Sequence, residues 1–143
     1  MKKQLKTTAL MAALVSGALT AGIAQAGMNN EAKVWADDQA VSEDTVTAKK
    51  VTAEVNGWLV VHRTGETMKP GPVVGYAPLK KGENMGVSAI LTEEVKSGDM
   101  LMLMVHAEEG GMKTGIFEYT LGAKEDGPIK KDGKLVMSTI TAK

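Results

Sequence analysis

One stretch of the sequence repeats soft metal ligands at every second position. Residues 100–107 read Met-Leu-Met-Leu-Met-Val-His-Ala. Because side chains alternate across a strand, a strand here puts three thioethers and one imidazole in a single row: Met100, Met102, Met104 and His106. Thioether sulfur selects Cu(I), and imidazole also binds copper. Neighbours in the row are about 6.6 Å apart, a distance that flexible methionines can bridge. We therefore predict a copper site that uses Met102, Met104 and His106.

The second histidine of the chain extends this prediction. His62 shares one strand face with Trp58 and Val60, since these residues are spaced by two. If the strands that carry His62 and His106 are neighbours, the two imidazoles can approach each other. We expect His62 to be a further ligand, and His62 and Trp58 together to complete the site. Such a set would resemble the sites of periplasmic copper carriers.

The methionines also fit other roles. The sequence has ten, and eight of them follow residue 26. Methionine is a flexible filler of protein cores, and two histidines can simply join strands by hydrogen bonds. Methionine is also oxidised reversibly to the sulfoxide, so an oxidant scavenger is an alternative that would use the accessible residues Met28, Met68, Met85 and Met112. A third alternative is a structural or adhesive envelope domain with a specific edge partner, because lysines on the strands oppose indiscriminate edge pairing.

The sequence carries no catalytic motif. It has no cysteine, no His-Glu-x-x-His, no glycine-rich phosphate loop and no serine in a nucleophile-elbow context. The carboxylate pairs Glu93-Glu94 and Glu108-Glu109 lie in predicted turns, where solvated charges are the expected role. Asp37-Asp38 and Asp126 offer oxygen ligands for a hard cation, but their spacing matches no known loop. We expect a protein that is not an enzyme.

These residues are expected to lie on short strands. Apolar and β-branched segments alternate with turn signals at short intervals, as is typical of a β-sandwich. The predicted strands are residues 33–37, 45–55, 57–63, 73–76, 87–91, 100–107, 115–121 and 134–141. Asn56-Gly57 predicts a hairpin, and the continuous apolar character of residues 57–63 predicts a central strand buried on both faces. We expect an all-β fold, a single immunoglobulin-like or cupredoxin-like sandwich of seven or eight strands.

Residues 1–26 have the features of a cleaved signal peptide. Three lysines precede an uncharged run over residues 7–23, and Ala24-Gln25-Ala26 offers a peptidase site. Cleavage would leave one domain, residues 27–143, with 14 basic and 17 acidic residues. A mildly acidic surface argues against nucleic acid as a partner, and no second apolar run could span a membrane. We expect a periplasmic or extracellular protein whose partner is a metal ion or an envelope protein.

Six short motifs cover most of the chain after Val34. They are Ala36-Asp37-Asp38-Gln39, Gly57-Trp58-Leu59-Val60-Val61-His62, Val74-Gly75-Tyr76-Ala77-Pro78-Leu79, Met104-Val105-His106, Phe117-Glu118-Tyr119 and Asp126-Gly127-Pro128. In this order they resemble a family of small secreted β-sandwich domains of unknown function, common in halophilic archaeal and bacterial surface proteins. The resemblance implies a sandwich fold and an envelope location, and no settled activity. The sequence departs from that family by adding Met100 and Met102, and by having Arg63 and Ala107 where an acidic residue often follows the histidine.

Overall fold

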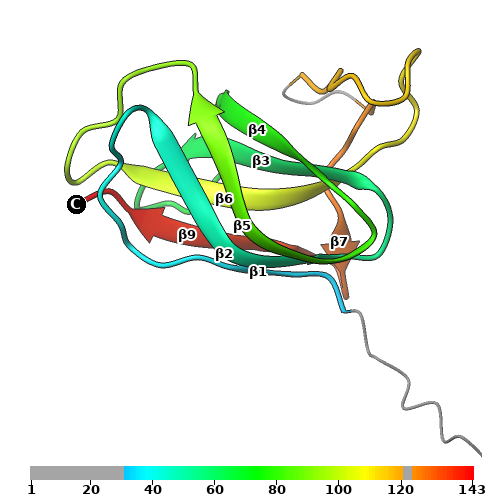
Figure 1. Cartoon of the computed structure of the whole chain (residues 1–143), viewed down its shortest axis with the longest axis horizontal. Coiled ribbons are helices and arrows are strands. Elements are labelled where there is room, and N and C mark those ends of the chain that lie inside the picture. Colours follow the sequence, from blue (N-terminus) through cyan, green and yellow to red (C-terminus); the bar gives the residue numbers. More distant parts are fainter. Residues whose placement is uncertain (1–30, 121–123) are drawn as a thin grey trace, which may run out of the picture.

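The structure is a computed structural model that describes residues 31–120 and 124–143 (Figure 1). The described residues form strands and no helix, which confirms the predicted all-β fold. The strands are β1 (Lys33–Trp35), β2 (Thr45–Ala53), β3 (Gly57–Thr64), β4 (Val73–Leu79), β5 (Gly82–Leu91), β6 (Met100–Ala107), β7 (Lys130–Lys131), β8 (Lys134–Leu135) and β9 (Met137–Thr141). The predicted signal peptide lies outside the described residues.

Seven strands form one strongly bent antiparallel sheet in the order β1-β2-β5-β4-β3-β6-β9, and β7 and β8 form a separate ribbon. The sheet bends between β4 and β5, whose ladder has only the pairs Gly75↔Leu91 and Tyr76↔Ile90. As a result, β2 and β5 cross in front of β3, β6 and β9 as a second layer (Figure 1). Beyond the outer strands, Gln39 and Ala142 form a parallel bridge. The sandwich is therefore nearly closed into a barrel.

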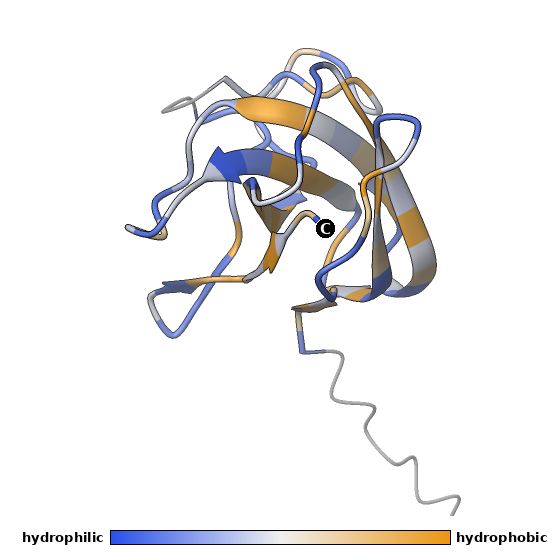
Figure 2. Ribbon diagram, turned by 90° about the vertical axis from the view of Figure 1, so that its left-hand side faces the viewer, coloured by the Kyte–Doolittle hydropathy of each residue, from blue (hydrophilic) through white to orange (hydrophobic). Residues whose placement is uncertain are grey.

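Aliphatic side chains fill the space between the two layers. They include Val46, Val51, Leu59, Val61, Leu101, Leu103, Val105 and Ile140. Apolar segments lie along the strands and hydrophilic ones along the loops (Figure 2). Because side chains alternate along a strand, the residues between these core positions point to the outer face of the sheet. On β3 and β6 that outer face carries Trp58, Val60, His62, Met102, Met104 and His106.

β3 is buried on both faces, as its apolar sequence predicted, and so is β6. Residues 57–62 of β3 and 101–106 of β6 are all buried. The two strands pair along their whole length, from Gly57↔Ala107 to Thr64↔Met100. The two histidine-bearing strands are therefore neighbours, which meets the condition for the two imidazoles to approach, and the outer face of this strand pair is a second buried layer.

The hairpin predicted at Asn56-Gly57 is wrong. β2 pairs with β1 and β5, whereas β3 pairs with β4 and β6, so the chain crosses between the two layers here. Asn56 supports this crossing by accepting hydrogen bonds from Lys81 N and Glu108 N. Gly57 is needed for close packing, because a Cβ there would lie 2.0 Å from the carbonyl oxygen of His106. Asn56-Gly57 thus forms the crossing between the two layers and allows the close contact of β3 with β6. It does not form a tight turn.

The strand predicted at residues 115–121 is also wrong. Residues 115–120 have no ladder partner, and residue 121 lies outside the described part of the chain. The aromatic side chains of Phe117 and Tyr119 pack on the outer face of β3 and β6 instead, against Trp58 and the two histidines. Their alternation, which resembles that of a strand, reflects packing against this layer.

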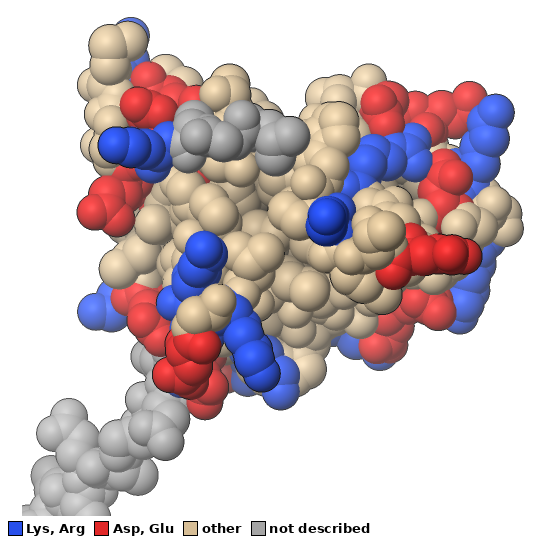
Figure 3. Space-filling model, turned by 180° about the vertical axis from the view of Figure 1, so that it is seen from behind, with Lys and Arg blue, Asp and Glu red and all other residues tan. Residues whose placement is uncertain are grey.

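Charged side chains of both signs are scattered over the surface, as one face of the molecule shows (Figure 3). Among the residues that the structure describes, ion pairs join some of them, including Lys131 to Glu31 and Arg63 to Asp99. Within residues 31–120 and 124–143, no helix is long and apolar enough to cross a membrane.

Candidate metal centre

Two histidines meet on the outer face of the β3–β6 pair. In the ladder, His62 lies opposite Met102 and His106 lies opposite Trp58, with the pair Val60↔Met104 between them. His62 and Trp58 are four residues apart, which is about 13 Å along a strand. Nevertheless, the Nε2 atoms of the two histidines are 3.4 Å apart. The imidazoles therefore lean toward each other across the Val60–Met104 pair.

The other nitrogen of each ring is held by a backbone carbonyl. His62 Nδ1 is 2.8 Å from the oxygen of Gly71, and His106 Nδ1 is 2.6 Å from the oxygen of Asp126. A carbonyl oxygen only accepts hydrogen bonds, so each Nδ1 has to carry the proton and donate it. In a neutral imidazole the second nitrogen is then an acceptor. Both Nε2 atoms therefore direct a lone pair into the space between the two rings.

Burial keeps these rings neutral. Both side chains are fully buried. Desolvation lowers the pKa of His62, opposed by the hydrogen bond to Gly71. It also lowers the pKa of His106 to about 4, with a further lowering from His62 and an opposing effect of the hydrogen bond to Asp126. At neutral pH, neither imidazole carries the second proton that would link the two Nε2 atoms.

The separation of the two nitrogens suits a shared metal ion. An imidazole nitrogen lies about 2.0–2.1 Å from a bound zinc ion, and metal–imidazole bonds of other first-row ions are similar in length. Two such bonds at about 110–120° to each other place the nitrogens about 3.3–3.6 Å apart. The observed 3.4 Å falls in this range. Trigonal and tetrahedral coordination both leave room for one or two further ligands.

Two thioethers lie in the same buried layer. Met102 and Met104 are fully buried, and the ladder puts Met102 opposite His62 and Met104 between the two histidines. Met100 is only partly buried at the end of β6, opposite Thr64. The described residues contain no group of three or more His, Cys, Asp or Glu side chains that could hold a metal ion. A metal ion bound by this histidine pair would therefore take its further ligands from the thioethers.

The loop after β3 fixes the orientation of His62. The N–H of Gly71 donates a hydrogen bond to the carbonyl oxygen of Arg63, and the carbonyl oxygen of Gly71 accepts one from His62 Nδ1. The N–H of Arg63 donates in turn to the carbonyl oxygen of Pro72. A Cβ at Gly71 would lie 2.8 Å from the Arg63 oxygen, so glycine is required at this contact. The Arg63 side chain is itself held by Glu93, Asp99 and the carbonyl of Glu94. These contacts give His62 the kind of outer-shell support that metal-binding histidines have.

Residues 108–120 and 124–128, which we call the cover segment, fix His106 and enclose the pair. The carboxylate of Asp126 accepts hydrogen bonds from Glu109 N at 3.1 Å and Glu118 N at 2.7 Å, while its backbone oxygen holds His106. The Tyr119 ring lies edge-on over both histidines, with centroids 4.5 Å from His106 and 6.0 Å from His62. The cover segment thus shields the two imidazoles from water.

Four of the five aromatic residues of the chain gather at this site. Trp58, Tyr76, Phe117 and Tyr119 form edge and tilted contacts with one another. Trp58 lies opposite His106 in the ladder, so it is close to the pair as predicted. Its indole N–H is buried and has no hydrogen-bond partner in the described part of the chain. Trp58 therefore lines the site, and none of its contacts supports a role as a metal ligand.

The structure brings together all the residues that the sequence singled out for metal binding. Met102, Met104, His106 and His62 share one buried layer. The hard-cation alternative is not supported by the contacts, because Asp37 pairs with Lys49, Asp38 accepts from Thr141 N and Asp126 accepts from two backbone N–H groups.

Sequence reasoning missed the residues that orient and enclose the pair. These are Gly71, Asp126, Phe117 and Tyr119. The available signal was the accumulation of rare aromatic residues shortly before Asp126-Gly127-Pro128, which the prediction of a strand at residues 115–121 obscured.

Comparison with known proteins identifies the family. Residues 32–143 match the family described as Domain of unknown function (DUF7282), and the chain therefore belongs to it. The sequence-based assignment to an uncharacterised family is confirmed at this level. No curated protein and no solved structure matched the chain.

Proposed function

We propose that this DUF7282 domain is a non-enzymatic binding module for a soft metal ion, Cu(I), in the periplasm or outside the cell. The proposed ligands are the Nε2 atoms of His62 and His106 together with the thioethers of Met102 and Met104. One observation carries the proposal: the two buried histidines donate both Nδ1 protons to carbonyl oxygens and turn both Nε2 lone pairs toward each other at 3.4 Å.

A purely structural histidine pair is expected to look different. Two neutral imidazoles that only join strands gain most when the N–H of one donates to the free nitrogen of the other. Here both N–H groups are used elsewhere, so two acceptors face each other in a buried space. Buried acceptors without a donor are unfavourable. A cation between the two nitrogens satisfies both of them.

The surroundings favour a soft ion of low charge. The proposed ligands are neutral, and thioether sulfur binds Cu(I) in preference to hard ions. A thioether has no proton to lose, and the lowered pKa values of the two histidines keep their nitrogens free for the metal at neutral pH. The aromatic cover over the pair excludes water. A buried site of this kind is suited to holding Cu(I).

The test is a titration of the purified protein with Cu(I), against a colorimetric chelator of known affinity, under anaerobic reducing conditions. The native protein should withdraw one equivalent of Cu(I) from the chelator. The double variant Met104→Leu/His106→Leu should withdraw none, because it loses a nitrogen and a sulfur ligand while it retains apolar volume. The matched control is Met85→Leu/Met112→Leu, which removes two exposed methionines and should bind as the native protein does. Equal binding by the site variant and the native protein would rule out these ligands.

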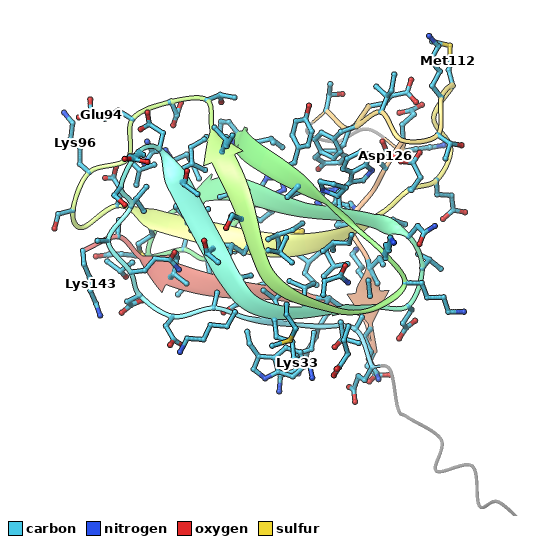
Figure 4. All side chains as sticks on the ribbon, viewed as in Figure 1. Lys33, Glu94, Lys96, Met112, Asp126 and Lys143 are labelled. Carbon is cyan, nitrogen blue, oxygen red and sulfur yellow. The ribbon has the colours of Figure 1, made fainter. Side chains whose placement is uncertain are left out.

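A second function is favoured by a different set of residues. Met68, Met85 and Met112 are exposed by 49%, 71% and 94%. Met112 lies at the outermost tip of the cover segment, away from the strands (Figure 4). Exposed thioethers are oxidised first and can be reduced back by sulfoxide reductases. We propose oxidant scavenging by these three methionines as the alternative, and this role does not need the histidine pair.

A further inference from the structure

Tyr119 touches the buried histidine pair on one side and solvent on the other. His62 and His106 have no exposed surface, whereas Tyr119 is half-buried. The ring centroid of Tyr119 lies 4.5 Å from that of His106 and 6.0 Å from that of His62, and the two imidazole centroids are 5.5 Å apart. The three rings therefore form a compact triangle, in which the phenol ring lies beside the gap between the imidazoles.

That gap is the place of the proposed ion. The two Nε2 atoms are 3.4 Å apart, which is much less than the distance between the imidazole centroids, so both atoms lie on the facing edges of the two rings. An ion bound to both atoms would therefore lie beside the Tyr119 ring, within the roughly 6 Å over which a cation and an aromatic ring interact. Tyr119 is thus placed to limit what else can reach the ion.

Tyr119 and the proposed thioether ligands reach this gap from different elements. The two methionines belong to β6, within the sheet, whereas Tyr119 belongs to the cover segment. The Tyr119 ring stands at 83° to the plane of His106 and at 78° to that of His62, so it spans both imidazoles and stacks on neither. Phe117 extends this wall, with its centroid 6.1 Å from Tyr119 and 6.2 Å from His106. Aromatic rings therefore cover the pair on this side.

We infer that Tyr119 is a specificity-determining residue of the metal site: its ring keeps solvent ligands off the ion, which is then bound by protein ligands alone. This inference rests on the proposed function. Cu(II) prefers tetragonal coordination by nitrogen and oxygen, whereas thioethers select Cu(I). Exclusion of water withholds oxygen ligands from the ion and leaves it nitrogen and sulfur. The Tyr119 ring therefore favours Cu(I), and a site closed in this way also keeps small reactive molecules from the ion.

Carbon monoxide tests whether the ion is open to a small ligand, because it binds Cu(I) and the bound molecule gives an infrared band. Tyr119→Ala removes the ring, and Tyr119→Phe is the matched control that keeps it. Each purified protein is held in excess over Cu(I) under anaerobic conditions, and the chelator titration confirms that the copper is bound. Circular dichroism confirms the fold of each variant before carbon monoxide is added.

We expect no copper-bound carbon monoxide in the native protein or in Tyr119→Phe. In Tyr119→Ala the band should appear, because carbon monoxide then reaches the ion and can displace a thioether. A merely structural role of Tyr119 would lower stability or Cu(I) affinity without opening the ion to carbon monoxide. A band in the native protein or in Tyr119→Phe, or no band in copper-loaded Tyr119→Ala, would overturn the inference and leave the metal site standing. Failure of the native protein to bind Cu(I) would overturn the proposed function itself.

If Tyr119→Ala does not fold or does not hold copper, Tyr119→Leu takes its place. Leucine keeps an apolar side chain on the cover segment but is too short to span both imidazoles, so we expect the infrared band in this variant as well. Its absence from copper-loaded Tyr119→Leu would contradict the inference. If neither variant holds copper, the native protein decides, since a band there is incompatible with a closed site and no band supports one.

Discussion

At the scale of single residues, the proposed metal site depends on which atom of each histidine carries the proton. The carbonyl oxygens of Gly71 and Asp126 settle this, since both accept from Nδ1 and leave Nε2 free. Desolvation then lowers the pKa of each ring and keeps both neutral. Two backbone atoms and the absence of solvent therefore leave two imidazole nitrogens free for the proposed metal ion.

The same burial predicts how stability depends on pH. The pKa of His106 is about 4 in the folded protein against 6.5 for an unperturbed histidine, so below pH 6.5 the unfolded chain binds a proton that the folded protein does not. The free energy of unfolding of the metal-free protein should fall as the pH drops from 6.5 to about 4, by about 3 kcal/mol from this residue. Above pH 6.5 His106 should contribute no slope.

Urea denaturation at pH 7, 5.5 and 4.5, with the metal removed by a chelator, measures this slope. Carboxylates titrate in the same range, so His106→Leu is compared with the native protein at each pH. The gap in stability between the two should shift in favour of His106→Leu as the pH falls. A gap that is the same at all three pH values would contradict the pKa assigned to His106.

At the scale of secondary structure elements, the site depends on how closely β3 and β6 approach each other. The pair Gly57↔Ala107 begins their ladder, next to the pair of Trp58 and His106. Gly57 packs so tightly that an added Cβ would lie 2.0 Å from His106 O and 3.1 Å from the Cα of Ala107. These are backbone atoms, which cannot rotate away as a side chain can. Gly57 therefore sets the spacing of the two strands beside His106.

The substitution Gly57→Ala should consequently disturb both the fold and the site. We expect a loss of about 1–3 kcal/mol in the free energy of unfolding, as for other overpacked positions, together with weaker Cu(I) binding. Gly65→Ala is the control, since a Cβ at Gly65 meets no atom within 4 Å and its φ is not positive. Denaturant unfolding and the chelator titration measure the two effects. Native stability in Gly57→Ala would show that β3 and β6 can separate at little cost.

At the scale of the whole molecule, the methionines divide into two groups. Met102 and Met104 are buried on the outer face of β6, whereas Met85 and Met112 are exposed on β5 and on the cover segment. The bent sheet produces this division because it buries both faces of β6 and leaves the outer face of β5 in solvent. The two proposed functions would therefore use separate residues, buried methionines for the metal ion and exposed ones for oxidation.

Limited oxidation with hypochlorous acid separates the two groups. Met112 and Met85 should be converted to the sulfoxide before Met102, because access limits the reaction. Peptide mass spectrometry after increasing doses gives the order. Met28, a further candidate from the sequence, lies outside the described residues, and its oxidation can be followed in the same experiment. Early oxidation of Met102 would show that the cover segment opens readily, and would argue against an enclosed metal site.

Sequence patterns predicted most of the strands and the strand face on which each candidate ligand lies. The limits of β6 were predicted correctly at residues 100–107, and its alternation puts Met102, Met104 and His106 on one side. The length of apolar sequence in β3 indicated burial on both faces, which the structure confirms. These features can be predicted from local sequence. Side chains alternate with a period of two in any strand, and apolar residues favour burial in any fold.

Long-range packing, which no local pattern records, determines which segments of the chain meet. The order of strands, the crossover at Asn56-Gly57 and the packing of Phe117 and Tyr119 over the histidines join residues that are far apart in sequence. Asp126 holds His106 across twenty residues, and His62 meets His106 across forty-four. Local sequence preferences do not predict such contacts, because backbone ladders of similar strength can form between many pairs of strands. Their selection depends on how well all the side chains pack together.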